Sequence, residues 1–379
     1  MIRRGGLYIH LPFCSSLCHY CHFVRSALHD HQLRREVVAA IGQEFRLRRE
    51  RCQVLRQGRR ALETVYVGGG TPSLLELGLF QQLLTETAGQ LSRTDPGEVT
   101  AEANPESFTP ELADGWRQAG VNRVSLGVQS LDDTVLHRLG RNCSARVARQ
   151  AVALACRTFS RVSIDLILGP GCRREPLLAG LRELVAAGVG HVSLYILELF
   201  PGTELARQVE AGQVQMPRSS TLEVSYLAAV ALLAELGLPQ YEVANFARPG
   251  EESNHNRHYW SRLPYLGLGP GAHGFWGRRR YANCSEIGEY LRRITVGELP
   301  ESEVDPLSPT ARRLEQLILP LRTRDGVPLA ILPAGALLLA KGEAAGLWVC
   351  ADGRLTLTPR GYLQIDSIEI MLARALASA

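Results

Sequence analysis

Short apolar runs alternate with amphipathic segments through the first 200 residues, and this alternation limits the possible folds more than any other feature. The runs are rich in β-branched and aromatic residues, have the length of strands and end in turn residues. Strand–helix units in strict alternation predict a parallel sheet with right-handed crossovers, and strands that are apolar on both faces indicate burial on both faces. The predicted strands are Gly6–Pro12, Thr64–Val67, Glu98–Ala103, Arg123–Val128, Arg161–Leu168 and His191–Leu197. The predicted helices are Leu33–Leu55, Leu74–Leu91, Pro110–Ala119, Ala145–Arg157 and Pro176–Ala187.

Six such units are too few for a closed eight-fold barrel, so we expect a partial (β/α)6 barrel that is open on one side. Polar residues follow the C-terminal ends of the predicted strands, and packing of a hydrophobic core does not require them there. In a parallel barrel these C-terminal strand ends form one edge, and that edge carries the ligands. The residues are a cysteine cluster after the first strand, Gly68–Pro72, Glu102, Gln129, Asp165 and Glu198.

The alternation fades after about residue 240. Tyr241–Phe246 is one further candidate strand, and a stretch rich in glycine and aromatic residues follows it, from Pro249 to Tyr281. Ser308 is a predicted N-cap, Asp352-Gly353 is a strong hairpin signal within Leu347–Leu357, and a last helix starts near Tyr362. Helices with one hairpin predict a small α+β domain of the winged-helix type. We therefore divide the chain into a barrel (1–240), a connecting segment (241–305) and a C-terminal domain (306–379).

Composition excludes several classes of function. The chain has 42 basic and 38 acidic residues, a net charge of +4, and no clustering of arginine that predicts a nucleic-acid partner. Its longest apolar stretches, Ile331–Ala340 and Tyr226–Ala234, are much shorter than the roughly 20 residues that span a bilayer. The N-terminus lacks the apolar core of a signal peptide. We expect a soluble cytoplasmic protein with at most peripheral membrane contact.

Three of the nine cysteines, Cys14, Cys18 and Cys21, lie within eight residues and form the strongest chemical signal. Zinc structural sites usually take four protein ligands, so a zinc site here requires His19 or His22 as the fourth. Three thiolates instead suit a 4Fe–4S cluster in which the fourth iron is free to take a small molecule. The remaining cysteines are scattered singly, and we interpret them as structural thiols.

The sequence from Tyr8 to Cys21, with the order Tyr-x-His-x-Pro-Phe-Cys-x3-Cys-x-Tyr-Cys, resembles the signature of radical S-adenosylmethionine (SAM) proteins. More narrowly, the chain is similar to the family that contains the oxygen-independent coproporphyrinogen III dehydrogenase HemN and the haem chaperones HemW. Further motifs of this family span nearly the whole chain; they include Gly68–Pro72, Glu102–Pro105, Gly127–Ser130, Leu139–Arg141, Asn254–Trp260 and Gly271–Gly274.

The resemblance implies a partial barrel with a small C-terminal domain, a 4Fe–4S cluster, SAM and haem. It assigns the cluster to Cys14, Cys18 and Cys21, and implies one-electron cleavage of SAM with electrons from an unidentified donor. Backbone N–H groups of the glycine turn are expected to approach the amino acid part of SAM. The SAM-binding residues it implies are Tyr8, Tyr20, Gly69, Gly70, Thr71, Glu102, Gln129, Arg141 and Asp165.

Three features favour a haem chaperone, which hands haem to acceptor haemoproteins, over the dehydrogenase. Only seven residues precede Tyr8, Phe23 stands where the dehydrogenase has a further cysteine, and His255–Trp260 matches the HNxxYW element of the chaperones. In that element His255 is the candidate haem ligand, because imidazole ligates haem iron. The alternative is oxidative decarboxylation of coproporphyrinogen III. A shortened Gly169–Gly171 turn and the histidines at 19 and 22 depart from the family pattern.

Overall fold

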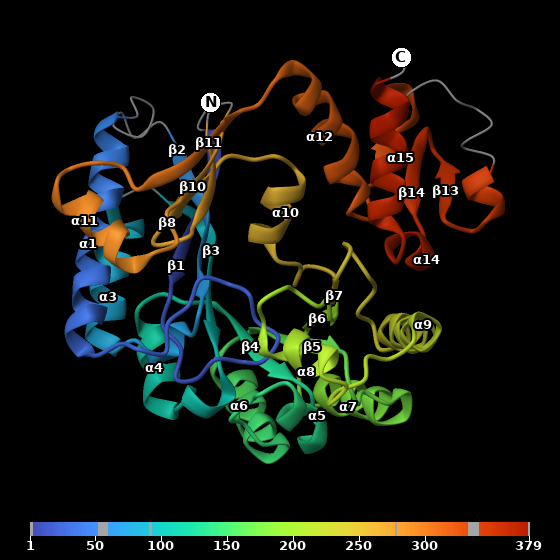
Figure 1. Cartoon of the computed structure of the whole chain (residues 1–379), viewed down its shortest axis with the longest axis horizontal. Coiled ribbons are helices and arrows are strands. Elements are labelled where there is room, and N and C mark those ends of the chain that lie inside the picture. The colour runs from blue at the N-terminus through green and yellow to red at the C-terminus, as the bar shows by residue number, and fades with distance from the viewer. Residues whose placement is uncertain (1–2, 52–59, 91–92, 277–278, 333–340, 378–379) are drawn as a thin grey trace.

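A parallel sheet forms the centre of the molecule and confirms the predicted α/β class (Figure 1). The computed structural model describes residues 3–51, 60–90, 93–276, 279–332 and 341–377. The six predicted strands are all present, and each pairs in parallel with the next along the chain. They are β1 (Arg3–Leu11), β2 (Arg60–Gly69), β3 (Arg93–Ala103), β4 (Arg123–Gln129), β5 (Arg161–Leu168) and β6 (His191–Ile196).

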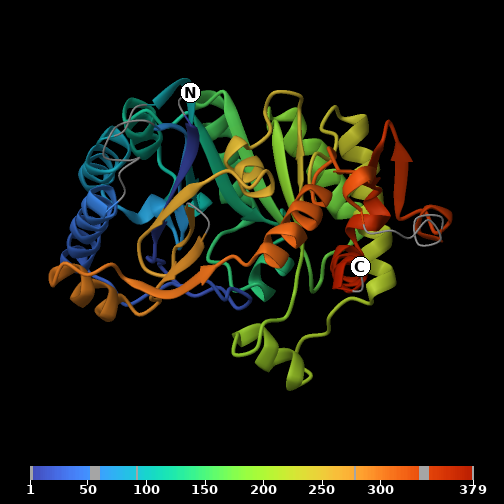
Figure 2. The same ribbon diagram turned by 90° about the horizontal axis from the view of Figure 1, so that it is seen from above.

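Most helices of the barrel lie along the outer side of the curved sheet (Figure 2). The predicted first helix is observed as α1 (His31–Arg51), and its predicted continuation to residue 55 lies outside the described residues. The second is shorter than predicted: α3 (Leu77–Glu86) is flanked by the short 3-10 helices η1 (Pro72–Leu74) and η2 (Ala88–Gln90). The other barrel helices are α4 (Pro110–Gln118), α5 (Asp133–Arg138), α6 (Ala145–Thr158), α7 (Arg174–Ala186), α8 (Glu204–Glu210) and α9 (Ser219–Glu235), with the 3-10 helix η3 at Pro105–Ser107.

The described strands extend the sheet beyond the six units at both edges. Next to β6 lies the short antiparallel β7 (Asn245–Ala247), in the region of the predicted seventh strand. Next to β1 lies β8 (Tyr265–Leu268), which pairs in parallel with it, and three antiparallel strands follow. These are β9 (His273–Trp276), β10 (Arg279–Asn283) and β11 (Glu301–Pro306), with α10 (Asn254–Trp260) and α11 (Ile287–Thr295) in the same segment. The barrel is open, because β7 and β11 are the two edges of the sheet.

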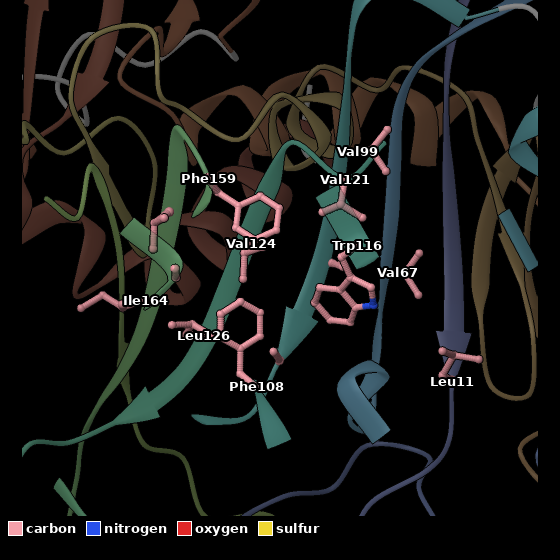
Figure 3. Close-up of a cluster of buried hydrophobic side chains, with 14 of the residues drawn as sticks. Leu11, Val67, Val99, Phe108, Trp116, Val121, Val124, Leu126, Phe159 and Ile164 are labelled. Atoms are coloured by element: carbon pink, nitrogen blue, oxygen red, sulfur yellow. The ribbon is translucent and has the colours of Figure 1, made fainter. Parts of the chain in front are cut away.

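The main hydrophobic core lies between the sheet and its helices (Figure 3). Trp116 of α4 is fully buried and stacks on Phe80 of α3, with ring centroids 5.1 Å apart. Thr109 starts α4 as predicted: its side chain accepts a hydrogen bond from the Leu112 amide, and Pro110 occupies the first turn. Apolar side chains of the strands, such as Val124 and Leu126, complete this core and fix the sheet that carries the site.

A second hydrophobic cluster forms a small antiparallel domain at the C-terminus. Its strands are β12 (Val327–Pro328), β13 (Trp348–Ala351) and β14 (Arg354–Leu357), and its helices are α12 (Pro309–Leu321), η4 (Leu329–Ile331), α14 (Pro359–Tyr362) and α15 (Ile365–Ala377). The predicted Ser308 cap is present, and both Asp352 (φ 50°) and Gly353 (φ 71°) adopt the left-handed conformation of a tight hairpin. The exact domain boundaries remain a prediction. Within the described ranges no helix combines the length and the apolar character needed to cross a bilayer.

Candidate cofactor site

A cavity of about 470 Å³ lies at the C-terminal ends of the parallel strands, where the sequence predicted the ligand site. Eleven of the predicted site residues line it, and only Tyr8 and His255 do not. The lining residues are Cys14, Cys18, Tyr20, Cys21, Gly69, Gly70, Thr71, Glu102, Gln129, Arg141 and Asp165. The fold thus gathers side chains from five strand ends and from the cysteine loop around one space.

The cysteine loop is held in place by hydrogen bonds of its own backbone. The Cys14 amide donates to the Ser26 carbonyl at 3.0 Å, and the Ser26 amide donates back to the Pro12 carbonyl. At the far side of the loop the His19 amide donates to the Leu139 carbonyl at 3.1 Å. The loop is therefore attached at one end to β1 and at the other to the turn after α5, which fixes the three thiols at the cavity wall.

The three thiols lie beside polar and cationic groups. Thr71 Oγ1 is 3.7 Å from Cys14 Sγ, and Arg141 Nη1 is 3.4 Å from Cys18 Sγ. Burial raises the pKa of Cys14 to about 11 and also raises the pKa of Cys21, although Arg25 favours the thiolate at both. Binding of a metal must therefore displace thiol protons, and the adjacent guanidinium groups favour a bound anionic centre.

The glycine turn after β2 packs tightly against the cysteine loop. A Cβ atom on Gly70 would lie 2.5 Å from the Phe13 carbonyl oxygen, and Gly69 has a φ of +112°. The amide of Gly70 donates to the Leu11 carbonyl, and that of Gly69 donates to Glu102. Both N–H groups therefore already have partners within the protein, and the approach of the turn's backbone to SAM stays a prediction. The glycines allow the turn and the cysteine loop to touch.

Two carboxyl groups face the cavity from neighbouring parts of the barrel. Glu102 accepts hydrogen bonds from the Tyr66 hydroxyl (2.7 Å) and the Gly69 amide (3.0 Å). Burial, with a smaller contribution from the charge of Asp165, raises the pKa of Glu102 to about 7. Burial also raises the pKa of Asp165, against hydrogen bonds from Ser125 and Ser193. These groups can accept hydrogen bonds from ligand hydroxyl or amino groups.

Arg141 forms hydrogen bonds with residues at the ends of two strands, β3 and β4. Its Nη2 donates to Asn104 Oδ1 (2.8 Å) and to the Gly127 carbonyl (2.9 Å), while Asn104 Nδ2 donates to Thr71 Oγ1. The Nε of Arg141 is buried and has no hydrogen-bond partner among the described residues. An unpaired donor in the cavity wall can donate a hydrogen bond to a polar ligand. Asn104 lies within the Glu102–Pro105 motif of the sequence, but it was not assigned to the site.

Gln129 reaches the cavity because the end of β4 is irregular. The register between β4 and β5 shifts between Leu126 and Gln129, and Gln129 has a φ of +62°. A non-glycine residue in the left-handed region costs free energy and is typical of positions that aim a side chain. Ser125 and Tyr195 also line the cavity. Sequence reasoning missed both, because each lies inside a strand and resembles a structural residue.

Tyr8 and His255 lie away from the cavity lining. The Tyr8 hydroxyl is 3.0 Å from His10 Nδ1, and the ring packs near Tyr66. His255 is buried, and both of its ring nitrogens have partners: Nδ1 is 2.8 Å from Thr64 Oγ1, and Nε2 is 2.8 Å from the Tyr259 hydroxyl. In this arrangement His255 has no nitrogen to offer to a haem iron.

The two histidines of the zinc alternative have other contacts. His19 Nδ1 is 3.2 Å from the Arg138 carbonyl, and the His22 ring stacks on Phe200 with centroids 3.6 Å apart. In the described part of the chain, no three or more His, Cys, Asp and Glu side chains are gathered closely enough to hold a single metal ion. The donor set that the loop presents to the cavity is three thiols, which suits a cluster with one open iron.

Comparison with known proteins agrees with this geometry. The family model described as the radical SAM superfamily matches residues 8–197. The heme chaperone HemW of Mycobacterium tuberculosis is 37% identical over 379 residues, which cover 96% of this chain and 93% of the relative. The mitochondrial radical S-adenosyl methionine domain-containing protein 1 of Bos taurus is 38% identical, covering 90% of this chain and 73% of the relative.

Among solved structures, the coproporphyrinogen III oxidase HemN of Escherichia coli, a radical SAM enzyme, has the same fold. The TM-score is 0.84, with 21% sequence identity, and the match covers 98% of this chain and 90% of the other. This agreement confirms the predicted architecture, including the small C-terminal domain.

Proposed function

The chain belongs to the radical SAM superfamily, in the family of the HemW proteins, and from this premise we propose that it is a haem chaperone. It binds a 4Fe–4S cluster, SAM and haem, and it passes haem to acceptor haemoproteins. The observation that carries the proposal is the 37% identity to a heme chaperone over 96% of the chain. We expect it to work in the cytoplasm, where its described cysteines, all free, stay reduced.

The residues of the cavity suit these cofactors. Cys14, Cys18 and Cys21 would hold the cluster, and Arg141 would lie against its Cys18 ligand. Side chains with both donors and acceptors, among them Glu102, Asp165 and Gln129, would hold the polar parts of SAM. Bound together, a cluster and SAM supply one-electron chemistry, for which an electron donor is required.

A second candidate function is the oxidative decarboxylation of coproporphyrinogen III, because HemN has the same fold. At 21% identity that likeness supports the fold alone. A fold hosts many functions, so it does not separate a carrier from an enzyme. We propose that the chain lacks this activity.

The cluster assignment is tested by replacing cysteines one at a time and counting iron and sulfide after anaerobic reconstitution. Cys14→Ala, Cys18→Ala and Cys21→Ala should each lose the cluster. Cys143→Ala and Cys172→Ala are matched controls, since burial raises the pKa of both thiols to about 11 and neither lines the cavity. Equal losses in the controls would contradict the assignment. Cys52, expected to be dispensable, lies outside the described residues.

Haem transfer tests the chaperone function. Reconstituted protein is loaded with hemin, freed of excess hemin, and mixed with an apo-haemoprotein whose Soret band differs from that of the donor. The proposal predicts that the acceptor's band grows at the expense of the donor's. A carrier that retains its hemin, while the same acceptor takes up free hemin, would contradict it.

A further inference from the structure

Exposed aromatic side chains gather around the mouth of the cofactor cavity. Phe23 is 59% exposed and Tyr195 is 43% exposed, and both line the cavity. Leu17 (51% exposed) lies on the cysteine loop, and Leu199 (38% exposed) lies between β6 and α8. Large apolar side chains exposed at one place on a protein mark a binding surface. We call the cavity-lining residues Phe23, Tyr195 and Phe200 the apolar mouth.

His22 stands among these side chains. Of the cavity-lining residues in the described ranges, it is the only histidine. Its ring is stacked on Phe200 at 3.6 Å and lies 4.9 Å from the ring of Phe23. Stacking occupies the face of an imidazole and leaves the two nitrogens at its edge. Neither nitrogen of His22 has a hydrogen-bond partner in the described part of the chain.

His255 and His191, by contrast, are buried, and their ring nitrogens already have partners. His255, which the sequence pattern favoured as the ligand, has both nitrogens paired with Thr64 and Tyr259. His191 is paired in the same way with Ser163 and Tyr241. An iron that bound one nitrogen of either histidine would have to break a buried hydrogen bond, which is costly because the former partner would be left unsatisfied. Binding at His22 breaks none.

The cavity mouth also offers a cation. Arg25 lines the cavity, its Nη1 donates to the Phe23 carbonyl at 3.0 Å, and its buried Nε has no partner among the described residues. A flat macrocycle with an iron at its centre and carboxylates at its edge needs a nitrogen ligand, aromatic surfaces and a cation. The mouth presents all three.

We propose that haem docks at the apolar mouth with His22 as its iron ligand. The inference rests on the proposed function, which supplies haem as the cargo, and adds where the cargo binds. It places the cargo on the protein surface, from which an acceptor can remove it. It also places it beside the cluster, because His22 directly follows Cys21.

Hemin titration of the full-length, reconstituted chain tests this site, with spectra recorded as differences from the hemin-free protein. His22→Ala should displace the Soret band and raise the apparent Kd at least tenfold, and added imidazole should restore the band position. Phe200→Ala should weaken binding several-fold without moving the band, since the ligand remains. His137→Ala is the control, because His137 is exposed and does not line the cavity. It should bind hemin as the unmodified chain does.

The outcomes distinguish a failure of the proposed haem site from a failure of the proposed chaperone function. An unmodified chain that binds no hemin contradicts the chaperone function, and the inference with it. Binding by the unmodified chain together with an unchanged Soret band and Kd in His22→Ala overturns the inference alone. The iron and sulfide content of His22→Ala should equal that of the unmodified chain. Loss of the cluster in His22→Ala, with no recovery of the Soret band on addition of imidazole, would also overturn the inference. His22 would then affect hemin binding through the cluster and not as the iron ligand.

Discussion

The guanidinium of Arg141 lies against the thiol of Cys18, with Nη1 3.4 Å from Sγ. The same side chain holds Asn104 and the Gly127 carbonyl, and it is only 5% exposed. One buried cation thus connects Cys18, a proposed cluster ligand, to the ends of two strands. Its carboxylate neighbour, Glu106, forms an ion pair with it at 3.8 Å, whereas Cys18 lies closer, at 3.4 Å.

Arg141→Ala should therefore make the cluster harder to reduce. A nearby cation stabilises the more negative, reduced form, so its loss should lower the midpoint potential by tens of millivolts, where about 59 mV corresponds to a tenfold change for one electron. Arg141→Lys keeps the charge and should retain most of the potential. The measurement is an anaerobic redox titration of both reconstituted variants. Equal potentials in Ala and Lys variants would show that the charge does not act on the cluster.

Gly70→Ala should lose the cluster although it removes no ligand. The new Cβ would lie 2.5 Å from the Phe13 carbonyl oxygen and 2.8 Å from the Phe13 amide, both backbone atoms next to Cys14. The cysteine loop must then move. Gly78→Ala is the matched control, because a Cβ there meets nothing within 4 Å. Iron and sulfide counts on both variants check this; full cluster content in Gly70→Ala would mean that the loop tolerates the shift.

His255→Ala should destabilise the fold and leave the Soret band of bound hemin in place. The change leaves Thr64 and Tyr259 unpaired and opens a cavity, at a cost of about 2–5 kcal/mol. Burial holds the pKa of His255 well below its usual 6.5, so the unfolded chain binds the extra proton and stability falls as the pH drops below about 6.5. The variant should lose that part of the pH dependence. Urea unfolding at pH 5.5 and 7.5 measures it, and a displaced Soret band would restore His255 as the ligand.

Glu102→Gln should remove a pH dependence of stability whose sign is opposite to that of His255. The pKa of Glu102 is raised in the folded chain to about 7, so the folded state binds the extra proton, and stability falls as the pH rises from about 4.5 to 7. The glutamine cannot ionise, so its stability relative to the unmodified chain should improve over this range by roughly 1–3 kcal/mol. Paired unfolding curves at pH 5 and pH 8 provide the comparison. A difference that stays constant with pH would show that Glu102 is ionised throughout.

The strand-end rule was sufficient to predict most of the cavity, because parallel strands deliver their last residues to one edge whatever the details of packing. Tyr8 and His255 came from the family resemblance and not from this rule. Tyr8 lies earlier in β1 than the edge, and the two hydrogen bonds of His255 come from residues distant in sequence or on the next helical turn. Strands β8 to β11 were not predicted, because short segments such as Tyr265–Leu268, which contains glycine, resemble loops. The packing of Gly70 on Phe13 depends on contacts that no local pattern reveals.

The most direct test of the central claim gives the reconstituted protein both hemin and coproporphyrinogen III under anaerobic reducing conditions with SAM. The account predicts a Soret band from bound hemin and no carbon dioxide released from coproporphyrinogen III. Release of carbon dioxide that depends on SAM and on Cys14, Cys18 and Cys21, with no binding of hemin, would contradict it.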